Sequence, residues 1–324
     1  MKKFNSNTKG AELQPIDSAV LSADHVAEID LFIRDQDIRP VSRTLYAKVV
    51  RFFFYWVLST ERKVNSLTRA DIIAYKETLL DSGLSPRTVA SYLVGVRRFY
   101  EWAEGAKIYP NIAKGIKSPS TRSRSTYLKQ HLDNEKGAEL LEHFRQSNLR
   151  DYALVNLLLR TGIRTVEAVR ANLEDITFKG GRRVLKVWGK GRDGKDDFVV
   201  LSDLVFGPIA EYVAQEREGA KNNEPLFVST SNNNQGGRLS TRTVSKICKA
   251  GLVAIGLNSR EYTAHSLRHT TAVQLLKMGA EISQVQNVMR HRSPVATMPY
   301  IESAREEIRL KQASELMLDG AFKK

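Results

Sequence analysis

The sequence predicts a mainly α-helical protein with a small antiparallel β-sheet, arranged as a helical first domain and an α+β second domain. Three observations support this prediction. Apolar residues recur at helical spacing between 22 and 112, the spacing disappears in 113–126, and short strand-like runs precede further helices after 127. The length of 324 residues allows two domains that each bury a core.

The first domain is predicted to contain four helices after a flexible leader at 1–21. Each helix has a start signal that satisfies its free backbone N–H groups, and two have glycine stops. The predicted starts are Ser22, Ser42, Thr68 and Ser85-Pro86, and the third and fourth helices are predicted to stop at Gly83 and Gly105. We therefore expect a small all-helical domain over 22–112.

A basic linker is predicted over 113–126. The wider stretch 113–130 reads AKGIKSPSTRSRSTYLKQ and has five basic residues and no acidic one. Its serines, single proline and single glycine interrupt every hydrophobic period. Either the segment is a solvated connection, or its cations, including Arg122 and Arg124, lie along phosphates. We favour the second interpretation.

The second domain, 127–324, is predicted to mix helices with a small sheet. A buried helix is expected over Asp151–Thr161, with Gly162 as its stop. The strands are expected at Ile176–Phe178, Arg183–Trp188 and Phe198–Leu201, and further helices are expected to begin at Thr241, Ser266 and Ser283.

The composition narrows the class of protein. A net charge of +14 favours a polyanion partner, either nucleic acid or an acidic membrane surface. The single cysteine, Cys248, excludes an internal disulfide and a CxxC metal site. No apolar run follows the basic Met1-Lys2-Lys3 start, and the longest apolar run, 52–58, is too short to span a bilayer. We expect a cytoplasmic protein in a reducing compartment.

The segment GKGRDGKD at 189–196 partly matches a phosphate-binding P-loop. The match fails at Asp196, where a serine or threonine would hold magnesium, and a strand follows instead of a helix. We therefore reject an ATPase. A β-hairpin whose turn carries Lys190, Arg192 and Lys195 fits better, and a charged surface turn is the simpler alternative.

Three further segments carry groups suited to chemistry. In AHSLRHT, His265 and Arg268 share a helix face, and His265 and His269 have zinc-like spacing, but Ser266 stands where a metalloprotease has its glutamate. In RTGIRTVE, Arg164 and Glu167 share a face. In MRHRSPVATMPYI, His291 precedes Tyr300 by nine residues. Each alone fits a core histidine, an exposed ion pair or a basic turn.

Together these residues resemble the tyrosine recombinase (phage integrase) family over about residues 24–318. TGIRTVE resembles the family's first arginine box, VWGKGRDGKDDFVVL its lysine hairpin, and TAHSLRHTTAVQLLKMGAEISQVQNVMRH its second arginine helix and the segment before the next histidine. The helical domain resembles the SAM-like core-binding domain. Two departures are Met289-Arg290, where the family usually has Leu-Gly, and Pro299, which biases Met298 toward an extended backbone.

The resemblance implies a site-specific DNA recombinase that forms a covalent 3′-phosphotyrosyl intermediate, without metal, ATP or any other cofactor. Tyr300 would be the nucleophile. The remaining roles would be phosphate binding by Arg164, Arg268 and His291, proton donation to the leaving 5′-oxygen by Lys190, proton acceptance from Tyr300 by His265, and orientation of Arg164 or His265 by Glu167.

The resemblance also implies double-stranded DNA as the partner, held in a clamp between the two domains. The residues predicted to contact DNA are Arg43, Arg87, Arg122, Arg124, Thr241, Arg242 and Lys246. A tail helix, Arg305–Leu318, would dock on a neighbouring protomer of a DNA-bound homotetramer or pack on its own domain; we favour exchange between protomers. Accessory proteins are possible partners, and no membrane partner is expected.

The short leader leaves no room for an additional DNA-binding domain, which favours a simple-site, Xer-like or transposon-encoded recombinase. The outcome would be integration, excision or resolution of a mobile element or replicon. Two alternatives stay open: a type IB topoisomerase that relaxes DNA by the same chemistry, and a DNA-binding accessory protein without catalysis.

Overall fold

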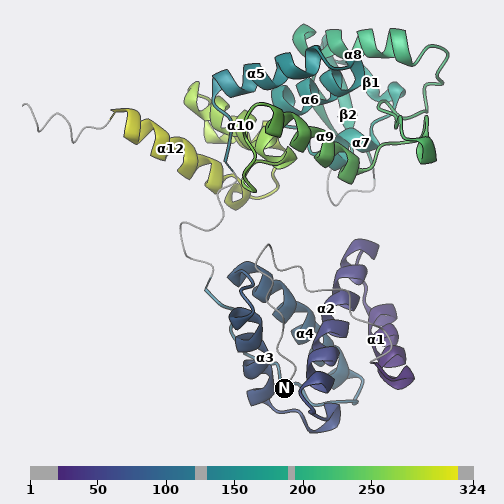
Figure 1. Ribbon diagram of the computed structural model, residues 1–324, viewed down its shortest axis with the longest axis vertical. Coiled ribbons are helices and arrows are strands. Elements are labelled where there is room, and N and C mark those ends of the chain that lie inside the picture. The colour runs from purple at the N-terminus through teal and green to yellow at the C-terminus, as the bar shows by residue number, and fades with distance from the viewer. Residues whose placement is uncertain (1–20, 121–129, 189–193, 313–324) are drawn as a thin grey trace, which may run out of the picture. The chain divides into compact units, whose positions relative to one another are not determined.

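The computed structural model describes residues 21–120, 130–188 and 194–312. Contacts within the chain divide it into two compact units, with the division between Arg124 and Ser125. The predicted class is confirmed, since helices dominate both units and the second contains a three-stranded antiparallel sheet (Figure 1). No helix in the described ranges is both long and apolar enough to cross a membrane.

The described part of the first unit, residues 21–120, is a bundle of four α-helices, drawn in purple to blue in Figure 1. They are α1 (Ala23–Asp35), α2 (Pro40–Ser59), α3 (Arg69–Asp81) and α4 (Pro86–Gly105), with a short 3-10 turn, η2 (Val64–Ser66), before α3. The side chains of Ser22 and Ser85 accept hydrogen bonds from backbone N–H groups of the first turn, and Thr68 forms a capping box, as predicted. The second helix begins at Pro40 rather than Ser42, because proline suits the first helical position.

Aromatic rings fill the core of the first unit. Phe53 meets Tyr75 with the ring centroids 5.0 Å apart, and Phe54 meets Phe99 at 5.2 Å. The core also buries Ala113 and Ile116, which follow α4. The first residues of the segment predicted to be a linker therefore pack on this unit.

The helix α6 (Leu149–Thr161) lies at the centre of the second unit and is buried along most of its length. Helices α5 (Asn134–Arg145), α8 (Asp203–Glu216) and α10 (Ala264–Lys277) pack around it. The remaining elements are α7 (Thr165–Arg170), η3 (Leu173–Asp175), β1 (Ile176–Lys179), β2 (Arg182–Val187), β3 (Asp197–Val200), η4 (Asn232–Asn234), α9 (Thr241–Ala254), α11 (Ile282–Met289), η5 (Pro294–Ala296) and α12 (Met298–Gln312).

The sheet has the order β1-β2-β3, and both pairs are antiparallel. Leu185 of β2 lies opposite Val199 of β3, and both are buried against the helices. Each strand lies within one or two residues of its prediction. The sheet thus holds the two ends of the segment 188–196, which joins β2 to β3.

Four helices of the second unit begin earlier than predicted. α6 begins at Leu149 instead of Asp151, and the predicted tail helix from Arg305 is the later part of α12, which begins at Met298. α10 begins at Ala264, because Thr263 is its cap and Ser266 is the third-position partner in the same capping box. α11 begins at Ile282, one residue before the predicted Ser283, with Glu281 as its cap. A serine near a helix start therefore identified the helix but not its first residue.

Candidate active site

Arg164 lies at the junction of α6 and α7, where the chain turns sharply. Gly162 ends α6 with a left-handed backbone (φ 59°), and a side chain there would collide with Met289 and Thr271. Arg164 then caps α7, and its Nη1 donates to Oε1 of Glu167 at 2.7 Å. The turn therefore fixes the backbone of Arg164 while Glu167 fixes its guanidinium.

Glu167 is fully buried and bonds with two arginines. Its Oε2 accepts from the Arg164 backbone N–H at 2.9 Å and from Nη2 of Arg290 at 2.8 Å. Burial alone would raise the pKa of Glu167, but Arg290 and Arg164 outweigh burial and lower it. The predicted contact with Arg164 is present, and Arg290 is a second partner that the sequence did not indicate.

Arg268 is held inside the protein by backbone carbonyls. Its Nη1 donates to the carbonyl of Gly162, and its Nη2 donates to the carbonyl of Met289. Burial, followed by the charges of Arg164 and Arg290, lowers the pKa of Arg268 to about 10. Arg268 therefore keeps its charge at neutral pH while only 2% of the residue is exposed.

His291 connects Arg268 to the loop before α12. Nη2 of Arg268 lies 3.1 Å from its Nε2, and Thr297 Oγ1 lies 2.8 Å from its Nδ1. Because Arg268 can only donate, Nε2 accepts, and we assign the ring proton to Nδ1, which donates to Thr297. Burial and the charges of Arg268, Arg164 and Arg290 lower the pKa of His291 to about 4.

Tyr300 lies in the first turn of α12 and is 8% exposed. Its ring stacks on His291, with centroids 5.7 Å apart, and meets the edge of His269 at 4.9 Å. Met298 is the first residue of α12, so the extended backbone predicted for Met298 is wrong. Pro299 instead occupies the first helical turn, where its missing N–H leaves no hydrogen bond unmade.

Two other residues, His265 and Lys190, were predicted to be catalytic, and the structure describes only His265. His265 is exposed near the start of α10, three residues before Arg268. Lys190 lies outside the described residues, as does Arg192. Lys195, from the same predicted turn, bonds with both carboxylate oxygens of the buried Asp175 at 2.7 Å. Lys195 therefore anchors the hairpin to η3.

The residues predicted to contact DNA fall into three groups. Thr241, Arg242 and Lys246 are exposed on α9, and Arg87 is exposed at the start of α4. Arg43 is partly buried and donates to the carbonyl of Gln36 at 3.0 Å. Arg122 and Arg124 lie outside the described residues.

Three contacts in the site were not predicted from the sequence. His269 was considered only as a zinc ligand, but its ring meets the ring of Tyr300. Thr297 supports His291, and Arg290 shares Glu167. Within the described ranges, no group of three His, Cys, Asp or Glu side chains is placed to hold a metal ion.

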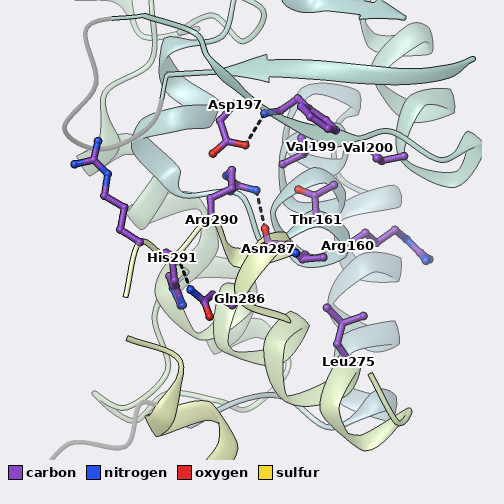
Figure 2. A pocket seen from close by; sticks show the side chains of 13 residues that line it. Arg160, Thr161, Asp197, Val199, Val200, Leu275, Gln286, Asn287, Arg290 and His291 are labelled. Carbon is purple, nitrogen blue, oxygen red and sulfur yellow. Dashed lines mark hydrogen bonds between the residues drawn. The ribbon is translucent and has the colours of Figure 1, made fainter. Parts of the chain in front are cut away.

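A cavity of about 620 Å³ lies beside Arg290 and His291, between the end of α6, β3 and α11. Arg290 and His291 line one side of it, and Arg160 and Leu275 the other (Figure 2). The cavity lies within the second unit, and Arg160, Arg290 and Arg292 contribute three of its lining residues.

The amino-acid sequence of the chain matches two family models. Residues 130–307 match the phage integrase family, and residues 29–107 match the phage integrase N-terminal SAM-like domain. The chain is 28% identical to tyrosine recombinase XerC of Actinobacillus pleuropneumoniae, over 75% of this chain and 76% of the relative. It is 25% identical to tyrosine recombinase XerD of Proteus mirabilis, over 87% and 89%.

Solved structures share the fold. A XerH site-specific recombinase in a post-cleavage complex with a difH substrate matches with a TM-score of 0.71 and 18% identity, over 91% of this chain and 89% of that one. The Tn1549 transposon integrase in complex with transposon right end DNA matches with a TM-score of 0.66 and 16% identity, over 89% and 99%. With one family model matching more than half of its length, the chain belongs to the phage integrase family of tyrosine recombinases.

Proposed function

We infer that this protein is a site-specific DNA recombinase that cuts and rejoins DNA strands through a 3′-phosphotyrosyl intermediate at Tyr300. The observation that carries this inference is the grouping of Tyr300, His291 and Arg268 in consecutive contact, with Arg164 held beside them by Glu167. We propose that the reaction serves integration, excision or resolution of a mobile element or replicon.

The proposed reaction exchanges one phosphodiester for another. The Tyr300 oxygen attacks phosphorus, the bond to the 5′-oxygen breaks, and the leaving oxygen takes a proton from Lys190. His265 is the proposed acceptor of the tyrosine proton. A 5′-hydroxyl from the partner strand then attacks the phosphotyrosine and releases Tyr300. The covalent link conserves the phosphodiester energy, so the exchange needs no ATP.

Two guanidiniums would stabilise the charge that develops on the nonbridging oxygens. Arg268 is fixed by the carbonyls of Gly162 and Met289, and Arg164 by Glu167, so neither has to reorganise when phosphate arrives. In the protein without DNA, His291 accepts a bond from Arg268. A bound phosphate would compete for that donor and favour a protonated His291, which would then donate to the same phosphate.

Double-stranded DNA is the proposed partner. The net charge of +14 supports it, as do the exposed cations on α4 and α9. The XerH and Tn1549 structures that share this fold are DNA complexes. Arg87, Arg242 and Lys246 would bind phosphates or base edges, whereas the bond of Arg43 to Gln36 makes it a weaker candidate.

We also propose that the chain acts as a homotetramer on paired sites, with the tail exchanged between protomers. α12 continues past Tyr300 to Gln312, and Leu310 near its end is 71% exposed. A chain ending after Gln312 is therefore expected to cleave a single site and to lose recombination between two sites.

The experiment that tests the proposed function compares two products. A supercoiled plasmid with two copies of the target site, taken from DNA flanking the gene, should yield two recombinant circles. A matched plasmid without the sites should stay supercoiled. Relaxation of both plasmids without recombinants would identify a type IB topoisomerase instead, and no change in either plasmid would favour an accessory protein without catalysis.

A further inference from the structure

Arg290 occupies a backbone conformation that favours glycine. It caps α11 with φ 51° and ψ 49°, in the left-handed region that branched and long side chains rarely adopt. An arginine in this conformation carries an energetic penalty relative to glycine. Its side chain must therefore make interactions that offset the penalty.

The Arg290 side chain is only 4% exposed and is bound at both ends of its guanidinium. Nη1 donates to the carbonyl of Val288 at 2.8 Å, and Nη2 donates to Oε2 of Glu167 at 2.8 Å. In the opposite direction, Nη2 of Arg164 reaches the backbone carbonyl of Arg290 at 3.4 Å. Arg290 and Arg164 are thus joined through one carboxylate and one carbonyl.

The charges at this junction do not cancel. A lone Glu167 would neutralise Arg164, and a neutral pair would attract a phosphate less strongly. With Arg290 present, one carboxylate is shared between two guanidiniums, and a net charge of +1 remains beside the proposed phosphate site. Arg290 is also the cap of α11 and the residue before His291. Its bond to Glu167 therefore connects the end of α11 to α7.

We propose that Arg290 is a positioning residue for the recombinase reaction: through Glu167 it orients Arg164, leaves that guanidinium's charge available to phosphate, and fixes the turn that presents His291. This inference rests on the proposed function. Figure 2 shows Arg290 beside His291 at the edge of the cavity.

The position of Arg290 also predicts an electrostatic signature. Burial and nearby cations lower the pKa of His291, and Arg290 is one of those cations. Removing Arg290 should raise the pKa of His291, because one of these positive charges is lost. The charged, titratable or hydrogen-bonding groups that face His291 are Arg164 at the start of α7, Arg268 and His265 on α10, Thr297 before α12, and Tyr300 on α12.

The test uses Arg290→Gly and Arg290→Asn in the full chain, because both residues tolerate the left-handed backbone and neither carries a charge. The probe is a nicked duplex that carries the target site and traps the covalent adduct. We measure the single-turnover cleavage rate from pH 5 to 9, the DNA affinity, and the thermal transition. Arg292→Gly, two residues away and exposed, is the matched control for loss of a cation.

We expect both Arg290 variants to fold, to bind DNA within about twofold of wild type, and to cleave at least about tenfold more slowly. Because the active form of His291 is protonated, the basic limb of their pH–rate profile should move to higher pH. In a protein that already carries Glu167→Gln, Arg290→Gly should slow cleavage by a smaller factor than in wild type, because the carboxylate that binds Arg290 is already gone.

Wild-type rates with an unshifted profile in a folded variant would overturn the proposal. Slower cleavage with an unshifted profile would assign Arg290 to stability alone and also overturn it, as would loss of the thermal transition in both variants. If wild type itself forms no adduct, the proposed function fails rather than the role of Arg290.

Discussion

The ring of His291 lies nearly parallel to the ring of Tyr300, with an interplanar angle of 10° and centroids 5.7 Å apart. His291 is bound at the same time to Arg268 through Nε2 and to Thr297 through Nδ1. A single imidazole therefore touches both the proposed nucleophile and a proposed phosphate ligand. The protonation state of this ring should influence both stability and cleavage.

The first prediction concerns stability and pH. The pKa of His291 is lowered from 6.5 to about 4, so between these values the unfolded protein binds more protons than the folded protein. The contribution of His291 is present above about pH 6.5 and is lost as pH falls toward 4. His291→Gln should therefore show a smaller drop in Tm between pH 7 and pH 5 than wild type. The pKa of His131 is also lowered by burial, but His131 is present in both proteins and does not affect the difference.

An equal drop in Tm in the two proteins would contradict the neutral state assigned to His291. His131→Gln serves as a parallel measurement, because it removes the other histidine with a lowered pKa and leaves His291 in place.

The second prediction concerns Arg268. Arg268→Lys keeps a cation but cannot donate to Gly162, Met289 and a phosphate in the same fork. We expect strand cleavage to fall about 10²–10³-fold, with DNA affinity little changed because Arg268 is buried. Single-turnover cleavage and a gel-shift titration measure the two effects. A lysine variant that cleaves like wild type would show that the fork geometry is unimportant.

The third prediction concerns the proton donor. Lys190→Ala should slow cleavage of an ordinary phosphodiester, and a substrate with sulfur at the 5′-bridging position should restore the rate, because a thiolate leaves without a proton. Lys195→Ala is the control on the same hairpin. Lys195 is bound to Asp175, so a defect in that variant should persist with the sulfur substrate. Equal rescue of both variants, or of neither, would contradict the role of Lys190.

The fourth prediction concerns the attachment of α12. Glu307 pairs with Lys277 at 2.7 Å and with His131, two turns after Tyr300. Glu307→Ala should lower the free energy of unfolding by about 1 kcal/mol, because Lys277 and His131 both lose their hydrogen-bonding partner. Glu306→Ala, an exposed neighbour, should change it much less. Similar effects of the two substitutions in urea denaturation would show that this contact does not hold the helix.

The sequence predicted the helical class, the small sheet and most capping residues, because these depend on local signals. Thr68, Ser85 and Gly162 act at the positions expected from backbone chemistry alone. The start of α2 was displaced to Pro40, and that of α10 to Ala264, because several residues near each start can satisfy the same N–H groups. Local signals therefore identify a helix more reliably than they identify its first residue.

The sequence predicted which residues form the candidate site but not the contacts between them. Tyr300, His291 and Arg268 were selected by resemblance, and their mutual contacts depend on packing between α10, α11 and α12. The pairing of Arg290 with Glu167 joins residues 123 positions apart, and no local pattern indicates it. The ring contact of His269 with Tyr300 was missed for the same reason.

If Tyr300 is the nucleophile, the protein should form a covalent adduct with its DNA target. Wild-type protein is incubated with a nicked duplex that carries the target site, and the products are separated in SDS. We predict an SDS-stable protein–DNA adduct with wild type and none with Tyr300→Phe, which keeps the ring that packs on His291 and His269. The same adduct from both proteins would exclude Tyr300 as the nucleophile.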